Sequence, residues 1–336
     1  MSRSAFEARY RQLKRSVDRR LAALGRVSEP KDLTEGLRYV LTGGGKRVRS
    51  VLLLLSCEAV GGKVHNALDA GAAVEIMHNF TLVHDDIMDN ARSRRGKPTV
   101  HTKWDVNNAL LVGDVLLGMA YASLFRGPTR EMHSVARVFT DGFLEVCKGQ
   151  ALDIELSRRK SVTVSDYFVM IEKKTARLIS MACEIGAMIG RATKRQQRAL
   201  RQFGRYLGRA FQVQDDLLDV VAEPGQFGKT VGGDILEGKK TFLLIKAAES
   251  VRGRDSELIQ GIMCAKRTAV HWTATRRREW VSLITDIYTR SGVVESAKQQ
   301  IARDTKKATA ALNMLSGNEA TEMLHWFSAM LLQRTS

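Results

Sequence analysis

The sequence predicts an all-α protein. Its 336 residues contain only four prolines, at positions 30, 98, 128 and 224, and proline is the residue that most strongly breaks helices. Apolar residues recur at spacings of three and four over long stretches, for example Leu178, Met181, Ala182, Ile185 and Ile189. This spacing places them on one face of a helix. We therefore expect helices joined by loops at glycine and proline clusters.

The expected elements follow from these breaks in chain order. Breaks are predicted at Leu41 to Gly45, Gly61-Gly62, Arg94 to Pro98, Gly127-Pro128, and Glu223 to Gly233. Two strongly apolar stretches, Val51 to Leu55 and Ala109 to Phe125, are interpreted as buried helices, because the first is too short to span a bilayer and the second contains Asp114. The weakly periodic, basic tract from Val251 to Trp280 is interpreted as a surface insertion or variable helices.

The composition is that of an ordinary soluble protein, with 44% hydrophobic and 26% charged residues. The four cysteines are far apart and lack the CxxC spacing of zinc or redox sites, which favours reduced thiols. Residues 1 to 20 contain no apolar stretch of the kind found in a signal peptide. We therefore expect a cytoplasmic protein. Its net charge of +17 is compatible with nucleic acid, an anionic membrane surface or acidic substrates.

Two aspartate clusters carry the strongest chemical signal. Asp85, Asp86 and Asp89 form one DDxxD pattern, and Asp215, Asp216 and Asp219 form a second. On a helix the first and last carboxylates of each cluster lie about 40° apart on one face, one turn apart. Hard oxygen ligands without histidine or cysteine in the motif favour magnesium, which typically takes one or two carboxylates and completes its shell with water and phosphate.

The simpler interpretation is that these aspartates form a solvated helix face. It is weakened by their context, since Phe80, Leu82 and Val83 precede the first cluster, and Phe211 and Val213 precede the second. Uncompensated charge at the end of an apolar stretch is costly. Each cluster is also followed by a glycine-containing basic loop. This repeat suggests two similar walls around one cavity, and hence a single domain spanning residues 1–336.

Cations accompany both clusters. Gly43 to Arg49 is a glycine turn that leads into Lys46, Arg47 and Arg49, a composition suited to cradling a diphosphate. Arg94 and Arg95 follow the first cluster, while Lys229 and Lys239 follow the second. His78 and His84 do not share one helix face, so we interpret His78 as a candidate phosphate donor rather than a metal ligand.

Taken together, these segments resemble the trans-isoprenyl diphosphate synthase (polyprenyl synthetase) family, most closely the archaeal-type geranylgeranyl diphosphate synthases. The resemblance covers about residues 35 to 250, in order, and leaves 251–336 as a variable helical region. It is carried by Gly44 to Arg49, His78 to Asp89, Arg94 to Thr99, Lys174-Thr175, Phe211 to Asp219, and Lys229 to Lys239. Ser50 departs from it, because the family usually has proline there, and this could loosen the start of the following helix.

The resemblance implies packed helices around a deep central cavity, with the two aspartate clusters facing each other across its mouth, and a homodimer. It implies that Asp85, Asp89 and Asp215 bind three Mg²⁺ ions, with Asp86, Asp216 and Asp219 supporting them. The residues that it assigns to the allylic diphosphate are Arg94, Lys174, Thr175, Gln212, Lys229 and Lys239. The residues that it assigns to isopentenyl diphosphate are Lys46, Arg49, His78 and Arg95.

The implied reaction ionises the allylic carbon–oxygen bond, after which the isopentenyl double bond attacks the cation and a proton is lost. The implied catalytic residues are Asp85, Asp89, Asp215, Arg94 and Lys174. In this family the residues just before the first cluster set the product length. Phe80 and Thr81 occupy those positions, which favours a C20 product, while Met77 and Val74 leave C15 and C25 products open.

Three other interpretations remain at the level of the sequence. A class I terpene cyclase shares the fold and the first aspartate motif, but it needs no isopentenyl diphosphate site and usually lacks the second aspartate cluster. A catalytically silent partner subunit is expected to have lost aspartates. A nucleic-acid-binding protein is suggested by the net charge and by Arg276 to Arg278 beside Trp280, although no nucleic-acid motif accompanies them.

Overall fold

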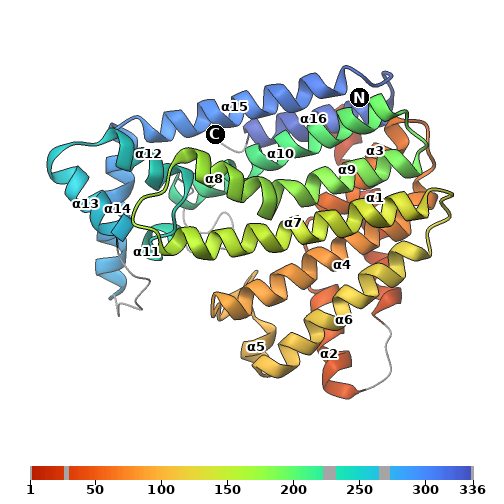
Figure 1. The fold of residues 1–336 in the computed structure, drawn as a ribbon, viewed down its shortest axis with the longest axis horizontal. Coiled ribbons are helices and arrows are strands. Elements are labelled where there is room, and N and C mark those ends of the chain that lie inside the picture. The colour runs from red at the N-terminus through yellow and green to blue at the C-terminus, as the bar shows by residue number, and fades with distance from the viewer. Residues whose placement is uncertain (1, 26–29, 222–231, 265–272, 334–336) are drawn as a thin grey trace. The chain divides into compact units, whose positions relative to one another are not determined.

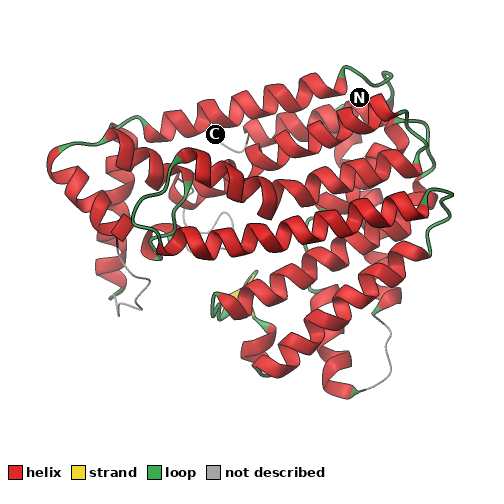
Figure 2. Cartoon of the chain, viewed as in Figure 1, coloured by secondary structure: helices red, strands yellow, loops and turns green. Residues whose placement is uncertain are grey.

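The computed structural model describes residues 2–25, 30–221, 232–264 and 273–333. Nearly every described element is a helix (Figures 1 and 2), which confirms the predicted all-α class. The chain forms two compact units, each assembled from segments that are distant in sequence. Unit 1 comprises residues 1–143, 178–204 and 309–327, and unit 2 comprises residues 144–177, 205–308 and 328–336.

The helices and strands lying in unit 1, or entering it, are α1 (Arg3–Leu24), α2 (Lys31–Thr42), α3 (Val48–Ala59), α4 (Val64–Met88), β1 (Ser93–Arg94), β2 (Lys97–Pro98), α5 (Val100–Lys103), α6 (Val106–Phe125), α7 (Met132–Arg158), α9 (Arg177–Ile189), α10 (Lys194–Val221) and α16 (Glu319–Gln333). Those of unit 2 include the second parts of α7 and α10, then α8 (Val164–Ile171), the π-helical turn η1 (Glu172–Ala176), α11 (Gly233–Leu236), α12 (Phe242–Ser250), α13 (Gly253–Cys264), α14 (Ala274–Arg290) and most of α15 (Val293–Leu312).

Four of the five predicted breaks lie within described residues, and each of them separates two helices. The glycines at 43 to 45 lie between α2 and α3, Gly61-Gly62 between α3 and α4, and Gly127-Pro128 between α6 and α7. The break at 94 to 98 is an antiparallel two-residue hairpin that pairs Arg94 with Lys97. Its strands are too short to give a recognisable period, so the sequence predicted only a loop. The segment before Gly233 lies largely outside the described residues.

Helix α4 is the centre of unit 1. It packs against α1, α3 and α6, and its residues Ala72 to Met77 are almost completely excluded from solvent. The packing of α4 on α3 is close, since a β-carbon added at Gly71 would be in van der Waals contact with Leu54 of α3, at 3.6 Å. Because α4 is held on several sides, the residues at its C-terminal end, from His78 to Asp89, are carried by a fixed element.

The prediction of two buried apolar helices is right for one and half right for the other. Val51 to Leu55 of α3 have no exposed surface. Helix α6, by contrast, buries Val112 and Leu116 against its neighbours but exposes Leu111 and Phe125 at 57% each. Periodicity identifies a helix but does not show which of its apolar faces the monomer covers. Among the described helices, α6 is also the one whose length and hydropathy would suffice to cross a membrane.

Unit 2 is built around α12. This helix packs against α8, α13 and α14, and Phe242 at its start contacts the rings of Tyr167 and Phe168. The basic tract from 251 to 280 contributes α13 and the first turns of α14, with residues 265–272 outside the described part of the chain. The described portion is therefore helical, as one of the two interpretations of this tract expected.

Candidate active site

Both aspartate clusters lie at the C-terminal ends of long helices. Asp89 is the C-cap of α4, and its N–H donates to the carbonyl oxygen of Asp85 at 2.8 Å. Asp215 to Asp219 lie in the last turns of α10, which ends at Val221. Neither helix has a basic residue in its last turn. Because unsatisfied carbonyls make this end of a helix partially negative, added carboxylates favour binding of cations there.

In unit 1, Arg94 binds the first cluster. Its Nε lies 2.8 and 3.0 Å from the two carboxylate oxygens of Asp86, and its Nη2 lies 2.7 Å from Oδ1. Burial raises the pKa of Asp86, and the guanidinium opposes that effect. The hairpin supplies this geometry, because β1 ends at Arg94 and the turn continues through Arg95 and Gly96 with positive φ angles. Asp86, assigned to the metal ions, and Arg94, assigned to the allylic diphosphate, are therefore bonded to each other in this structure.

The predicted isopentenyl diphosphate residues also converge in unit 1. Arg49 Nη1 lies 3.1 Å from His78 Nε2, and Arg95 Nη1 donates to the carbonyl oxygen of Gly44 at 2.7 Å. Burial and the guanidinium groups of Arg49 and Arg95 lower the pKa of His78 well below its usual value. The ring is therefore neutral, and its Nε2 accepts from Arg49.

The glycine loop is shaped for this approach. Gly45 has a φ of 132°, and a β-carbon there would lie 2.8 Å from Arg95 Nη1, so a side chain would collide with the guanidinium. Lys46 is held through its backbone, because the Tyr10 hydroxyl of α1 donates to its carbonyl oxygen. A cavity of about 70 Å³ opens beside this region, and Asp86, Arg94 and Arg95 are among its lining residues.

The residues predicted to set the product length lie on α4, just before the first cluster in the sequence. Phe80 is 8% exposed, and its ring centroid is 4.6 Å from that of His84 and 5.6 Å from that of Phe143 on α7. Met77 is completely buried. The Thr81 hydroxyl donates to the His78 carbonyl oxygen at 2.8 Å. The aromatic side chain singled out from sequence is thus one of three neighbouring rings.

In unit 2, hydrogen bonds link three predicted residues, and a fourth, Lys174, pairs with Asp153. Lys174 and Thr175 lie in η1, and the Thr175 hydroxyl donates to Gln212 Oε1 at 2.9 Å. Gln212 Nε2 in turn donates to Asp216 Oδ1 at 3.0 Å. Lys174 Nζ lies 2.5 Å from Asp153 Oδ2. A π-turn inserts one extra residue into a helix and is frequent at functional sites.

Close packing holds this turn in place. A β-carbon at Gly149 of α7 would lie 2.3 Å from the backbone nitrogen of Lys174, and one at Gly208 of α10 would lie 2.5 Å from the α-carbon of Ala176. Both distances are impossible for real side chains. Glycine at these two positions therefore allows α7 and α10 to reach the backbone of η1.

Asp216 is the buried centre of the unit 2 site. It is 2% exposed, and its Oδ2 accepts from the Tyr167 hydroxyl at 2.6 Å and the Phe242 N–H at 3.3 Å. Burial, followed by the charge of Asp234, raises its pKa to about 7. Burial would lower the pKa of Lys239, but Asp234 and Asp216 outweigh it and raise that pKa, so Lys239 stays a cation.

Asp219 has a structural partner as well. Its Oδ2 accepts from the N–H of Asp234 at 2.9 Å, at the start of α11. Lys239 Nζ lies 3.4 Å from Asp234 Oδ1, so the second cluster continues into α11 and the residues after it. Lys229 lies outside the described residues.

The sequence analysis missed three residues of this site: Asp153, Tyr167 and Asp234. Asp234 follows two glycines between the second cluster and Lys239, and that position could have suggested it. Asp153 and Tyr167 carry no comparable signal, because only the folded helices bring them to Lys174 and Asp216.

Ser50 stands where the family usually has proline, and this change was expected to loosen the start of the following helix. Helix α3 nevertheless begins at Val48, and the Ser50 hydroxyl lies 2.9 Å from Gly71 O and from Glu75 Oε2.

The donor set suits magnesium. All of the clustered side chains are carboxylates, which are hard oxygen ligands, and Mg²⁺ needs only one or two of them when phosphate oxygens and water supply the rest. Within the described part of the chain, no group of three or more His, Cys, Asp or Glu side chains forms a complete metal site by itself.

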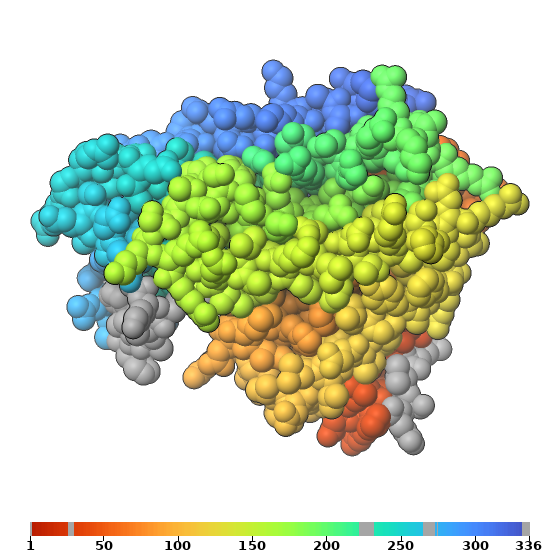
Figure 3. Space-filling model, in the orientation of Figure 1, coloured from red at the N-terminus to blue at the C-terminus, as the bar shows by residue number. Residues whose placement is uncertain are grey.

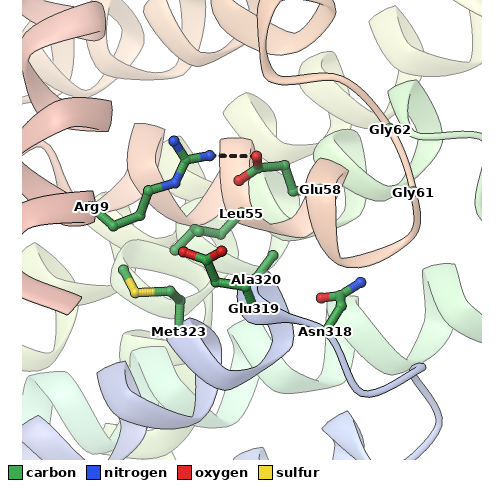
Figure 4. Close-up of a pocket in the computed structure, with 9 residues that line it drawn as sticks. All are labelled: Arg9, Leu55, Glu58, Gly61, Gly62, Asn318, Glu319, Ala320 and Met323. Atoms are coloured by element: carbon green, nitrogen blue, oxygen red, sulfur yellow. Dashed lines mark hydrogen bonds and ion pairs between the residues drawn. The ribbon is translucent and has the colours of Figure 1, made fainter. Parts of the chain in front are cut away.

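A larger cavity of about 260 Å³ lies elsewhere in unit 1, between α1, α3 and the start of α16. Figure 4 shows the guanidinium of Arg9 paired with Glu58, and the carboxylate of Glu319 on the opposite helix. None of the residues predicted to act in the site lines this cavity.

Comparisons with known proteins agree with this geometry. The sequence model of the family described as "Polyprenyl synthetase" matches residues 30–274. The chain is 38% identical over 306 residues to the short chain isoprenyl diphosphate synthase of Methanothermobacter thermautotrophicus, covering 91% of each protein. It is 37% identical to the geranylgeranyl diphosphate synthase of Methanosarcina mazei, covering 89% of this chain and 92% of the relative. The geranylgeranyl pyrophosphate synthetase structure from Pyrococcus horikoshii superposes with a TM-score of 0.90 at 33% identity, covering 98% of both chains.

Two further matches concern the product and the metal. The geranylfarnesyl diphosphate synthase of Natronomonas pharaonis is 31% identical over 92% of each chain. A polyprenyl synthase structure from Caulobacter crescentus, complexed with calcium and isoprenyl diphosphate, has a TM-score of 0.85 at 27% identity, covering 98% of this chain and 96% of that one. The family match, which spans most of the chain, and the agreement in fold show that this protein belongs to the polyprenyl synthetase family and is an enzyme that transfers prenyl groups.

Proposed function

We propose that this enzyme condenses isopentenyl diphosphate with an allylic diphosphate and that its product is geranylgeranyl diphosphate, with 20 carbons in its prenyl chain. The observation that carries this proposal is the cluster of Arg49, His78 and Arg95 beside the glycine loop. A cyclase has only one diphosphate to bind, whereas this chain has a second cationic site in addition to the residues around its aspartates.

The chain's own residues divide the work between two diphosphates. Arg49, Arg95 and Lys46 supply cations for isopentenyl diphosphate, and His78 orients Arg49 through its neutral ring. Lys174, Thr175, Gln212, Lys229, Lys239 and Arg94 hold the allylic diphosphate. Fixed donors of this kind stabilise charge that develops on a leaving group because they need no reorganisation during the reaction.

Asp85 and Asp89 of unit 1 and Asp215 of unit 2 are the carboxylates that would hold Mg²⁺, and we propose three ions when substrate is bound. Asp86, Asp216 and Asp219 support them, in agreement with the bonds that these three carboxylates make to Arg94, Tyr167 and the Asp234 N–H. When bound there, Mg²⁺ would supply positive charge that stabilises the diphosphate leaving group.

The reaction then needs no nucleophilic side chain. The allylic C1–O bond breaks and its electron pair leaves with diphosphate. The isopentenyl double bond forms the new bond to C1, and a proton lost from the condensed chain goes to the released diphosphate. The products are one longer allylic diphosphate and one free diphosphate. The residues around the prenyl chain exclude water, which would otherwise capture the cation.

The C20 product is supported by Phe80. Its ring is nearly buried between His84 and Phe143, so it presents fixed bulk on α4 just before the first cluster. A growing prenyl chain that reaches this ring cannot extend further without displacing it. The geranylgeranyl diphosphate synthases among the relatives support the same length, and the geranylfarnesyl relative supports C25 as the second candidate.

We also propose a homodimer that pairs the exposed face of α6. Leu110, Leu111 and Phe125 are exposed there, and residues of this helix, gold in Figure 3, lie on the molecular surface. Gly118 has no atom near its missing β-carbon, which leaves room for a second helix to approach. About a twofold axis, the apolar face of α6 in one subunit would pack against the same face in the other, as in most homodimers.

We further propose a cytoplasmic enzyme that associates with anionic membranes. Helix α15 exposes Lys298, Arg303, Lys306 and Lys307, and the chain carries a net charge of +17. Each cation near an anionic lipid surface contributes about 1 kcal/mol of attraction. A product with a long apolar chain would be released next to the phase that dissolves it.

Replacing Asp85 or Asp215 by Asn should lower turnover by about two orders of magnitude or more, because each change removes a charged ligand without changing side-chain size. Turnover is measured as radiolabelled isopentenyl diphosphate incorporated in the presence of Mg²⁺. Asp141→Asn, at an exposed position on α7, is the control and should retain activity. Normal turnover in both cluster variants would refute the metal assignment.

Phe80→Ala should lengthen the product beyond C20, because it removes the ring that limits the growing chain. Products are dephosphorylated and separated by chain length. Phe6→Ala is the matched control, since Phe6 stacks on Trp326 between α1 and α16; it should lower thermal stability and leave product length unchanged. An unaltered product from Phe80→Ala would place the length limit elsewhere.

Leu111→Glu should convert the dimer to monomers, because it introduces a charge into the centre of the proposed apolar contact. Molar mass is measured by light scattering after size-exclusion chromatography. Leu283→Glu changes another exposed leucine, on α14, and should leave the dimer intact. A wild-type protein that is monomeric at micromolar concentration would contradict the assignment of the α6 face.

The wild-type protein should sediment with phosphatidylglycerol vesicles at low salt and dissociate as salt is raised, since screening weakens attraction between exposed charges. Vesicles of phosphatidylcholine alone are the control and should not retain it. Combined Arg303→Glu and Lys306→Glu should reduce binding to the anionic vesicles. Equal sedimentation with both lipids would argue against the electrostatic proposal.

A further inference from the structure

Arg47 lies between two residues assigned to isopentenyl diphosphate, Lys46 and Arg49, but it does not face a substrate. It is 3% exposed. Its Nε donates to Asp18 Oδ1 at 2.9 Å, its Nη1 to Glu75 Oε1 at 3.2 Å and its Nη2 to the Leu41 carbonyl oxygen at 3.0 Å. One guanidinium therefore joins α1, α2 and α4 to the residue that begins α3.

The backbone of Arg47 shows why such an anchor is needed. It is the N-cap of α3 and has a φ of 52° and a ψ of 31°, the left-handed conformation that residues with a β-carbon rarely adopt. Such a conformation persists only where surrounding contacts enforce it. The side-chain bonds of Arg47 therefore hold the backbone at the junction between the glycine loop and α3.

Glu75 is the second half of the anchor. It is 3% exposed, and besides Arg47 it has the Ser50 hydroxyl 2.9 Å from its Oε2. Glu75 lies one turn before His78 on α4, and Ser50 directly follows Arg49 on α3. The contact between Glu75, Arg47 and Ser50 therefore sets the register of α3 against α4. That register determines whether Arg49 reaches His78.

We propose that Arg47 and Glu75 are a positioning pair that holds the isopentenyl diphosphate site in its binding geometry without touching the substrate. This inference rests on the proposed function. The pair is too well buried to contact a diphosphate, and breaking it would leave the other charge buried without its main partner. Loss of either residue should therefore weaken one substrate site selectively, as well as the fold.

Arg47→Lys keeps the positive charge but loses the fork that reaches three acceptors. We expect the KM for isopentenyl diphosphate to rise between about tenfold and a hundredfold, the range that a small displacement of binding groups produces. The KM for the allylic diphosphate and kcat should change little. Glu75→Gln, which keeps the shape of the side chain, should act in the same direction. Both KM values, kcat and the thermal unfolding temperature are measured for each variant.

Asp69→Asn is the matched control. Asp69 of α4 also pairs with an arginine of α1, since Arg20 Nε lies 2.6 Å from Asp69 Oδ1. This ion pair does not involve the glycine loop. This variant should lower thermal stability and leave the KM for isopentenyl diphosphate unchanged. The control separates loss of an α1–α4 ion pair from loss of the anchor.

The inference is overturned if Arg47→Lys and Glu75→Gln behave like Asp69→Asn, or if both KM values rise together. Should Arg47→Lys fail to fold, the Glu75→Gln result decides. A wild-type protein that elongates no primer would contradict the proposed function itself. An active wild type with unchanged KM values in folded variants would contradict this inference alone.

Discussion

The site depends on carboxylates placed where helices are already negative. Both α4 and α10 end in aspartate clusters, and neither has a basic residue in its last turn. Each carboxylate at such an end opposes the helix dipole by about 0.3–1 kcal/mol, and burial adds to that cost. Cations must compensate, and the fold brings Arg94 to the first cluster and Lys239 close to the second. The proposed binding of a magnesium diphosphate would meet the same electrostatic demand.

Glycine determines how closely the cations can be placed. In unit 1 the absence of a side chain at Gly45 leaves room for Arg95 to reach the loop, and in unit 2 Gly149 allows α7 to touch the backbone of Lys174. In each case a β-carbon would occupy space that a functional residue now fills. The glycines therefore allow charged groups to lie close to the backbone. Arg47 has a left-handed backbone conformation although it carries a side chain, and its guanidinium is bonded to Glu75.

Much of the fold could be predicted from the sequence because the signals that begin and end its helices are local. Glycine and proline clusters marked the helix ends, and three-and-four spacing marked the helices. The two-residue strands at 93–94 and 97–98 were not predicted, since so short a segment shows no periodic pattern of apolar residues. The exposure of half of α6 was not predicted, for another reason. The sequence shows an apolar face at Leu111 and Phe125 but does not show whether the monomer or another surface covers it.

Site residues could be predicted where the resemblance to the family assigns them, as for Lys174, Thr175 and Gln212. The structure places the first two in one turn and joins Thr175 to Gln212 through a hydrogen bond. Residues that act through burial could not. Tyr167 and Glu75 look like ordinary helix residues, and their roles depend on the partners that folding supplies, Asp216 and Arg47. A buried hydrogen-bond network is a property of three-dimensional packing, which short-range spacing does not encode.

The most direct test of the account is elongation by the purified wild-type protein. It should be incubated with isopentenyl diphosphate and each of dimethylallyl, geranyl and farnesyl diphosphate, with Mg²⁺ or with a chelator in excess. The account predicts a C20 diphosphate as the main product in the presence of Mg²⁺ and no product with the chelator. Failure to elongate any primer, or equal elongation when the metal is chelated, would contradict it.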